Sequence, residues 1–232
     1  LVLALRARCL IGLGRYEEAI EDWAALGKAA FDQNESVDFE FAIQFARLVK
    51  AHGGENPKHS GAHMVELSLG PDPTAAARAQ AAMRLGDIQA VTELLPEIDF
   101  AEASQAAKVW LAIDDGAATT TKLAEECSVL ALSWLEDPFL VILAGELQRQ
   151  GHREAAERCL AAVPRDRDLI EQKIFDKQES PYLPVVETDI RAALFCVDGL
   201  QAKDGEQRAT LMKSARLHEQ VPGIVTRISE TW

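Results

Sequence analysis

Three of the chain's five histidines fall within twelve residues, and their spacing is the first feature that could support chemistry. If residues 59–66 form a helix, His59 and His63 share one face and Glu66 lies one turn further along. Imidazoles at this spacing can bind zinc, so His59 and His63 are the metal candidates of the sequence. A solvated loop that leads into a helix is the competing interpretation. Because an HxxxH pattern without HExxH is a weak signal, we favour the loop and predict no metal.

Paired carboxylates occur twice, as Asp114-Asp115 before Gly116 and as Glu125-Glu126. Such pairs can serve acid–base chemistry when their surroundings drive the two pKa values apart. Asp-Asp-Gly is also good turn chemistry, and two glutamates on an alanine-rich helix are typical of a solvated face. We therefore expect structural roles for both pairs.

Motifs that carry catalysis or cofactors are missing: GxSxG, GxxxxGK[ST], HExxH, the EF-hand pattern and a GxGxxG after a strand. The His52-Gly53-Gly54 run is similar to the oxyanion loop of esterases, but no nucleophile elbow accompanies it. The sequence predicts no enzyme and no cofactor within these residues. A helical-bundle enzyme that uses the region from His52 to His63 is the alternative.

The charge of the chain excludes several classes of partner. It carries 37 acidic and 24 basic residues, a net charge of −13 and a pI near 4.9. Such a field repels phosphates, so we expect neither nucleic-acid nor anionic-membrane binding. No apolar run approaches the roughly 18 residues that span a bilayer. The opening LVLALRARCLIGL has arginines inside its apolar stretch and no starting Met, so we expect a helix with more protein upstream rather than a secretory signal.

Four cysteines complete the composition: Cys9, Cys127, Cys159 and Cys196. None forms a CxxC pair, and each lies among aliphatic residues on a helix-like stretch, so we predict buried small hydrophobes. A reducing compartment, the cytoplasm, fits this usage best, while two disulfides and a periplasmic location are also compatible with it.

Helices are the only elements that the pattern predicts. Segments of 12–18 residues carry apolar side chains at helical spacing, which indicates about eleven to thirteen helices. Their starts are marked by Ser36, by Asp72-Pro73, by Asp99 with Glu102 in a capping-box arrangement, and by Asp137-Pro138. A short helix from Ser60 to Leu69 and helices around 185–202 and 205–218 are also expected.

Glycines recur at the ends of these helices with a period of about 34 residues. They are Gly14, Gly53, Gly86, Gly116 and Gly151. Seven residues before each glycine stands a small side chain: Ala7, Ala46, Ala79, Val109 and Ala144. A small residue at this position lets two helices of a hairpin approach closely, so we expect about five helix–turn–helix hairpins.

The hairpins resemble the tetratricopeptide repeat family. The first matches through Ala7, Gly14, Tyr16, Ala19 and Trp23, the fifth through Ala144, Gly151, Ala156, Leu160 and Pro164, and the third through Ala79, Gly86, Ile88 and Leu95. The second and fourth keep mainly their first helix. The resemblance implies a right-handed α-solenoid over 1–164, with an irregular insert at 53–71. We expect 165–232 to be a divergent helical cap packed on the array, or otherwise a separate helical subdomain.

The resemblance also implies a concave groove lined by the first helix of each hairpin. The inward-facing positions of the family carried onto this chain are Arg8, Glu40, Ile43, Arg47, Lys50, Gln80, Met83, Arg84, Trp110, Gln148 and Arg149. Five are basic and one is acidic, so the groove is expected to take an acidic or carboxylate-ending segment of another protein or peptide. The asparagines of the family's carboxylate-clamp members are missing here. Arginines near helix ends that are merely solvated remain the alternative.

The resemblance therefore predicts a protein–protein interaction or scaffold module. Its binding residues would be Arg8, Arg47, Lys50, Gln80, Met83, Arg84, Trp110, Gln148 and Arg149. The alternative is a non-catalytic recruiting portion of a larger, bacterial transferase-type enzyme whose catalytic domain lies outside these residues. The sequence indicates no oligomeric state.

Overall fold

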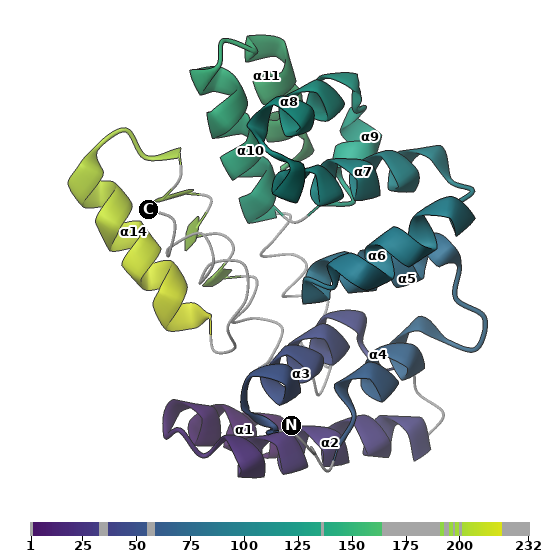
Figure 1. Ribbon diagram of the computed structural model, residues 1–232. Helices are drawn as coiled ribbons and strands as arrows, with labels where there is room; N and C mark the ends of the chain where they lie inside the picture. Colours follow the sequence, from purple (N-terminus) through teal and green to yellow (C-terminus); the bar gives the residue numbers. More distant parts are fainter. Residues whose placement is uncertain are drawn as a thin grey trace. The chain divides into compact units, whose positions relative to one another are not determined.

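A computed structural model describes residues 2–32, 37–54, 59–135 and 137–163, and in the C-terminal part 191–192, 195–196, 198–199 and 201–219. Within these ranges every regular element is a helix, which confirms the all-α prediction (Figure 1). The chain divides into two compact units. Unit 1 comprises Leu1–Asp72 and Asp168–Trp232, and unit 2 comprises Pro73–Arg167.

Unit 1 begins with two helical hairpins. Among the described residues, its helices with both ends defined are α1 (Val2–Gly12), α2 (Tyr16–Asp32), α3 (Phe39–His52), α4 (Gly61–Leu69) and α14 (Gly205–His218). Helix α1 packs against α2, α2 against α3, and α3 against α4. The core between them is aromatic, because Trp23 and Phe41 meet edge to face with their ring centroids 5.7 Å apart and Phe45 lies beside Phe41. All three rings are fully buried.

Close helix packing in unit 1 depends on two glycines. A Cβ atom at Gly61 would lie 2.7 Å from Ala46 Cα, and one at Gly27 would lie 2.5 Å from Met64 Sδ. Ala46 is one of the five small residues of the predicted repeat. Its role is therefore physical: α3 and α4 approach so closely that neither position at this crossing has room for a larger side chain.

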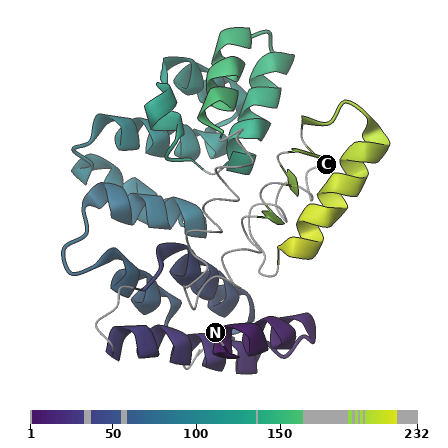
Figure 2. The ribbon, with the colours of Figure 1, turned by 180° about the vertical axis from the view of Figure 1, so that it is seen from behind.

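Unit 2 contains three further hairpins, drawn in teal and green in Figure 2. Its elements are α5 (Ala75–Leu85), α6 (Ile88–Leu94), the 3-10 turn η1 (Leu95–Glu97), α7 (Ala101–Asp115), α8 (Ala117–Glu126), α9 (Val129–Leu132), α10 (Asp137–Arg149) and α11 (Arg153–Ala162). The pairs α5/α6, α7/α8 and α10/α11 form the hairpins. Helix α7 also packs against α5 and α6, while α9 packs against α7 and α11.

The hairpin turns lie where the glycines predicted them, with one shift. Gly14, Gly86, Gly116 and Gly151 all have positive φ, a conformation that costs glycine little because it has no Cβ atom. In the second hairpin Gly53 has φ −78° and still donates to Val49 O at 2.7 Å, so the left-handed residue is Gly54, with φ +70°. The small residues seven positions before the predicted glycines are all buried: Ala7, Ala46, Ala79, Val109 and Ala144.

Helix starts agree with the sequence less closely than the turns do. Ser60 accepts from His63 N and begins α4, as predicted. The first turn of α5 is capped by Thr74 rather than by Asp72-Pro73, and the residue before α7 is Phe100, with no side-chain cap from Asp99. Asp38 caps α3, whereas the predicted Ser36 lies outside the described residues.

Much of the predicted C-terminal unit also lies outside the described residues, including its boundary at 164–165. Helix α14 occupies the range where a helix over 205–218 was expected. Two contacts accompany it: the rings of His218 and Phe195 have centroids 5.0 Å apart, and a Cβ atom at Gly199 would lie 3.0 Å from Met212 Sδ.

Candidate binding surfaces

Three of the predicted groove residues lie in unit 1. Arg47 and Lys50 are one turn apart on α3, where Arg47 is half-buried and Lys50 is exposed, so the structure brings these two cations to one side of the helix. Arg8 is half-buried on α1, and both α1 and α3 pack against α2. Ile43 is fully buried, which corrects its expected inward-facing position in the groove: it is a core residue between packed helices.

The other six groove residues lie in unit 2. Gln80 and Arg84 are half-buried and lie one turn apart on α5, and the Nε atom of Arg84 is buried. Trp110 is half-buried on α7, which packs against α5, while Gln148 and Arg149 are exposed at the end of α10. Met83 is buried, so the structure places it in the core of the unit instead of on a ligand-contacting wall.

The histidines do not converge. His52 stacks on Tyr16, with ring centroids 3.6 Å apart and planes 5° from parallel, and its burial lowers the pKa of the imidazole. His63 is exposed and its Nδ1 lies 3.7 Å from Glu66 Oε2, while His59 is half-buried before α4. Over the described ranges, no group of three or more His, Cys, Asp and Glu side chains is arranged to hold a metal ion.

The cysteines divide into one exposed and three buried residues, all with free thiols. Burial raises the pKa of Cys127 to about 11 and the pKa values of Cys159 and Cys196 to about 12. These three thiols are therefore protonated and poorly nucleophilic near neutral pH. Cys9 is exposed on α1, which corrects the prediction that all four are buried. The aliphatic neighbours of Cys9 in the sequence did not indicate burial, because α1 carries apolar residues on its exposed face as well.

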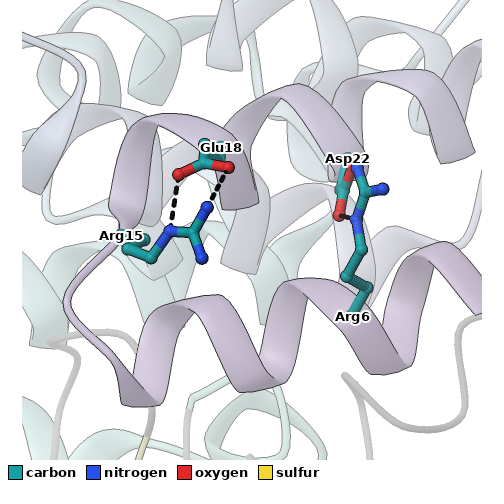
Figure 3. Close-up of polar contacts among 4 residues, drawn as sticks. All are labelled: Arg6, Arg15, Glu18 and Asp22. Atoms are coloured by element: carbon teal, nitrogen blue, oxygen red, sulfur yellow. Dashed lines mark hydrogen bonds and ion pairs between the residues drawn. The ribbon is translucent and has the colours of Figure 1, made fainter.

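A buried carboxylate links the first two helices, as Figure 3 shows. Asp22 on α2 is buried, and Arg6 on α1 donates to it from Nε at 2.6 Å and also from Nη2. These hydrogen bonds raise the pKa of the Arg6 guanidinium. A second pair, Arg15 with Glu18, spans the turn at 2.6 and 2.5 Å and is exposed at both ends. Neither pair was predicted from the sequence; a lone acid on the apolar side of α2 was the available signal for the first.

A polar cluster joins α8 to α11 in unit 2. Glu125 Oε1 contacts Nδ1 of His152, which stands directly before α11, and Arg158 donates from Nη2 to the Glu125 carbonyl. Nearby in the sequence, Thr121 Oγ1 donates to Gln150 Oε1 at 2.9 Å. Glu125 was expected on a solvated face; it is exposed, but it also ties the ends of two helices together. The side chains of Asp114 and Asp115 lie outside the described residues.

Two exposed apolar surfaces were also missed. The first, which we name the α1 stripe, consists of Val2, Leu5, Cys9 and Gly12. The second, which we name the α9 surface, consists of Phe100, Val129, Leu130 and Trp134. The spacing of 3, 4 and 3 residues in α1 was the signal for the stripe, because it adds a second apolar face to a helix that already has one.

Comparison with protein-family models, with curated proteins and with solved structures finds no match for this chain. Among the described residues, no helix has both the length and the apolar character needed to cross a membrane.

Proposed function

We propose that the chain is a protein-binding module built from tetratricopeptide-like helical hairpins. The observation that supports this proposal best is the repeated hairpin itself. Five pairs of consecutive helices turn at left-handed glycines, and a buried small residue precedes each turn. Repeats of this kind cannot each bury their apolar face alone, so stacking into a right-handed superhelix is the arrangement we propose for them.

The partner we propose is an acidic or carboxylate-ending segment of another protein. The first helices of the second, third and fifth hairpins carry Arg47 with Lys50, Arg84, and Arg149 at half-buried or exposed positions. Guanidinium groups bind carboxylates through paired hydrogen bonds, and a half-buried Trp110 offers apolar area to the rest of the segment. This cationic set stands in a chain with net charge −13, so it would discriminate among partners by charge.

A capture experiment with charge-reversed variants tests this proposal. We would compare the wild-type chain with Arg47→Glu/Lys50→Glu and with Arg84→Glu/Arg149→Glu, each with circular dichroism as a check of folding. The matched control is Arg78→Glu/Lys122→Glu, which makes the same charge change at exposed positions outside the proposed groove. Proteins retained by the wild type and the control, but lost by both groove variants, would support the proposal. Equal retention by all four chains would refute it.

The recruiting portion of a larger transferase-type enzyme is the second function we carry forward. It would use the same binding surface. The same capture experiment separates the two, because the retained protein would then be an acceptor of the group that the enzyme transfers.

A further inference from the structure

The α1 stripe is an apolar helix face with no neighbour among the described elements. Ala4, Ala7, Leu10 and Ile11 already bury the opposite face of α1. Val2 is 79% exposed and Leu5 is 46% exposed, and with Cys9 and Gly12 they follow the spacing of one helix face. A helix that is apolar on both faces is normally buried on both, so the stripe is a surface that a partner would cover.

The cations of α1 flank the stripe. At 100° per residue, Arg6 lies on one side of the line through Val2, Leu5 and Cys9, and Arg8 lies on the other. Arg6 donates to Asp22 but keeps 64% of its side chain exposed. Residues 1–16 contain three arginines and no acidic side chain. The stripe is thus an apolar surface with a basic border.

The α9 surface is the second unpartnered apolar feature, and it lies in unit 2. The rings of Phe100 and Trp134 meet with centroids 5.8 Å apart, and Phe100 is 50% exposed. Leu130 is 68% exposed and stands four residues before Trp134. Helix α9 ends at Leu132, and the chain continues as a tight turn in which Trp134 N and Leu135 N donate to the carbonyls of Ala131 and Leu132. With Val129, which is 41% exposed, the α9 surface thus has three exposed apolar side chains and the half-buried Trp134.

The segments that carry the α9 surface are acidic. Residues 87–102 contain five acidic side chains and residues 125–137 contain four, while neither segment contains a Lys, Arg or His. Of these carboxylates, Glu97, Asp99 and Glu126 are exposed. Exposed carboxylates therefore accompany the α9 surface along the chain, whereas arginines accompany the α1 stripe.

We propose that the chain assembles head to tail, with the α1 stripe of one copy packed on the α9 surface of the next. Pairing two copies of the stripe would bring arginines together, and pairing two copies of the α9 surface would bring carboxylates together. Only the mixed pairing places Arg6 and Arg8 beside carboxylates such as Asp99. Each added copy leaves one surface of each kind free at the ends, so the assembly grows into an open chain or closes into a ring.

The strength of this association is set by opposing charges. Each copy carries a net charge of −13, which repels the others over distances comparable with the Debye length. The local attraction and the burial of two small apolar surfaces must overcome that repulsion. We therefore expect a weak assembly that depends on protein concentration. Of the proposed groove residues, only Arg8 borders one of the two surfaces, and the groove variants leave Arg8 unchanged.

Sedimentation velocity over a concentration series tests the proposal. The wild-type chain is expected to sediment faster as its concentration rises, while Leu5→Glu and Leu130→Glu each remain monomeric. A mixture of the two variants restores one intact interface, since Leu130→Glu keeps the stripe and Leu5→Glu keeps the α9 surface. The mixture is therefore expected to form dimers that grow no further. A reductant is present throughout, because the exposed Cys9 could form disulfides between copies.

The controls keep the test decisive. Leu217→Glu changes another strongly exposed leucine, on α14, and is expected to assemble like the wild type. If Leu5→Glu fails to fold by circular dichroism, Val2→Glu replaces it, since Val2 is the more exposed residue of the stripe. A wild-type chain that is monomeric at every concentration overturns the proposal. So does a mixture of folded variants that forms no dimer, or an assembly that only one of the two substitutions disrupts.

Discussion

Replacement of Gly61 by alanine is expected to destabilise the α3/α4 hairpin, against the usual direction of such a change. A glycine-to-alanine substitution within a helix normally stabilises it by about 0.8–1 kcal/mol. At Gly61 the added Cβ atom would lie 2.7 Å from Ala46 Cα and 3.4 Å from Ala46 O, which are backbone atoms of the neighbouring helix. Overpacking of this kind typically costs about 1–3 kcal/mol. Because Gly61 is the first residue of α4, its propensity gain is small, and the steric cost should prevail.

Two further glycines turn this expectation into a graded series. At Gly27 the added atom would meet Met64 Sδ at 2.5 Å, but a methionine end can rotate away, so Gly27→Ala should cost less than Gly61→Ala. Gly145 lies within α10 with no atom inside 4 Å of an added Cβ, so Gly145→Ala should stabilise by about 0.5–1 kcal/mol.

Urea unfolding followed by far-ultraviolet circular dichroism measures the series through the free energy of unfolding. Gly61→Ala is expected to be less stable than the wild type and Gly145→Ala more stable, with Gly27→Ala between these two variants. If Gly61→Ala were as stable as Gly145→Ala, α3 and α4 would have room between them. The close approach assigned to Ala46 and its counterparts in the other hairpins would then be wrong.

Four other outcomes follow from the charged and titratable groups. Arg6→Ala should lower the urea midpoint more than Arg15→Ala, because it leaves the buried Asp22 carboxylate without its donor, whereas the partner of Arg15 is exposed. Ellman's reagent at pH 8 should titrate Cys9 at once and the other three thiols only after unfolding. The same three thiols ionise near pH 9 in the unfolded chain and near pH 11–12 in the folded chain. Between these values the unfolded chain binds fewer protons, so the free energy of unfolding should fall as pH rises through that window. Cys159→Ala should lessen this fall. Burial lowers the pKa of His52, so the unfolded chain binds more protons than the folded chain below about pH 6.5. The free energy of unfolding should therefore fall as pH is lowered through that region. The fall should be smaller in His52→Phe.

The helices and their turns could be predicted because their causes are local. Gly14, Gly86 and Gly151 adopt positive φ, which a side chain would oppose, so the residue type identifies the turn without knowledge of any neighbour. The shift from Gly53 to Gly54 shows the limit of this reasoning. Both residues are glycine, and the choice between them depends on a final hydrogen bond to Val49 that the sequence does not specify.

The candidate sites were harder to predict because they depend on which elements meet. A helical period shows that α3 and α5 have apolar faces, but positions one residue apart differ by 100° around the axis. Ile43 and Met83 were therefore assigned to a ligand surface, and both are buried. For the α1 stripe the difficulty was the opposite one, because residues of core type are exposed. Val2 and Leu5 are residue types typical of a core, yet both are exposed. Among the described elements, α1 packs mainly against α2.

The two proposals concern different surfaces, and this allows them to fail separately. Charge reversal at Arg47 and Lys50 alters no residue of the α1 stripe or the α9 surface, so a chain that loses its captured partner should still sediment as an assembly. Leu130→Glu removes one assembly surface and leaves all the groove cations in place. A monomeric Leu130→Glu chain that retains the same partner as the wild type would show that binding needs only one copy. Loss of both properties in Leu130→Glu, with the fold intact, would instead show that the partner binds the assembled chain. The groove would then have to be sought across neighbouring copies.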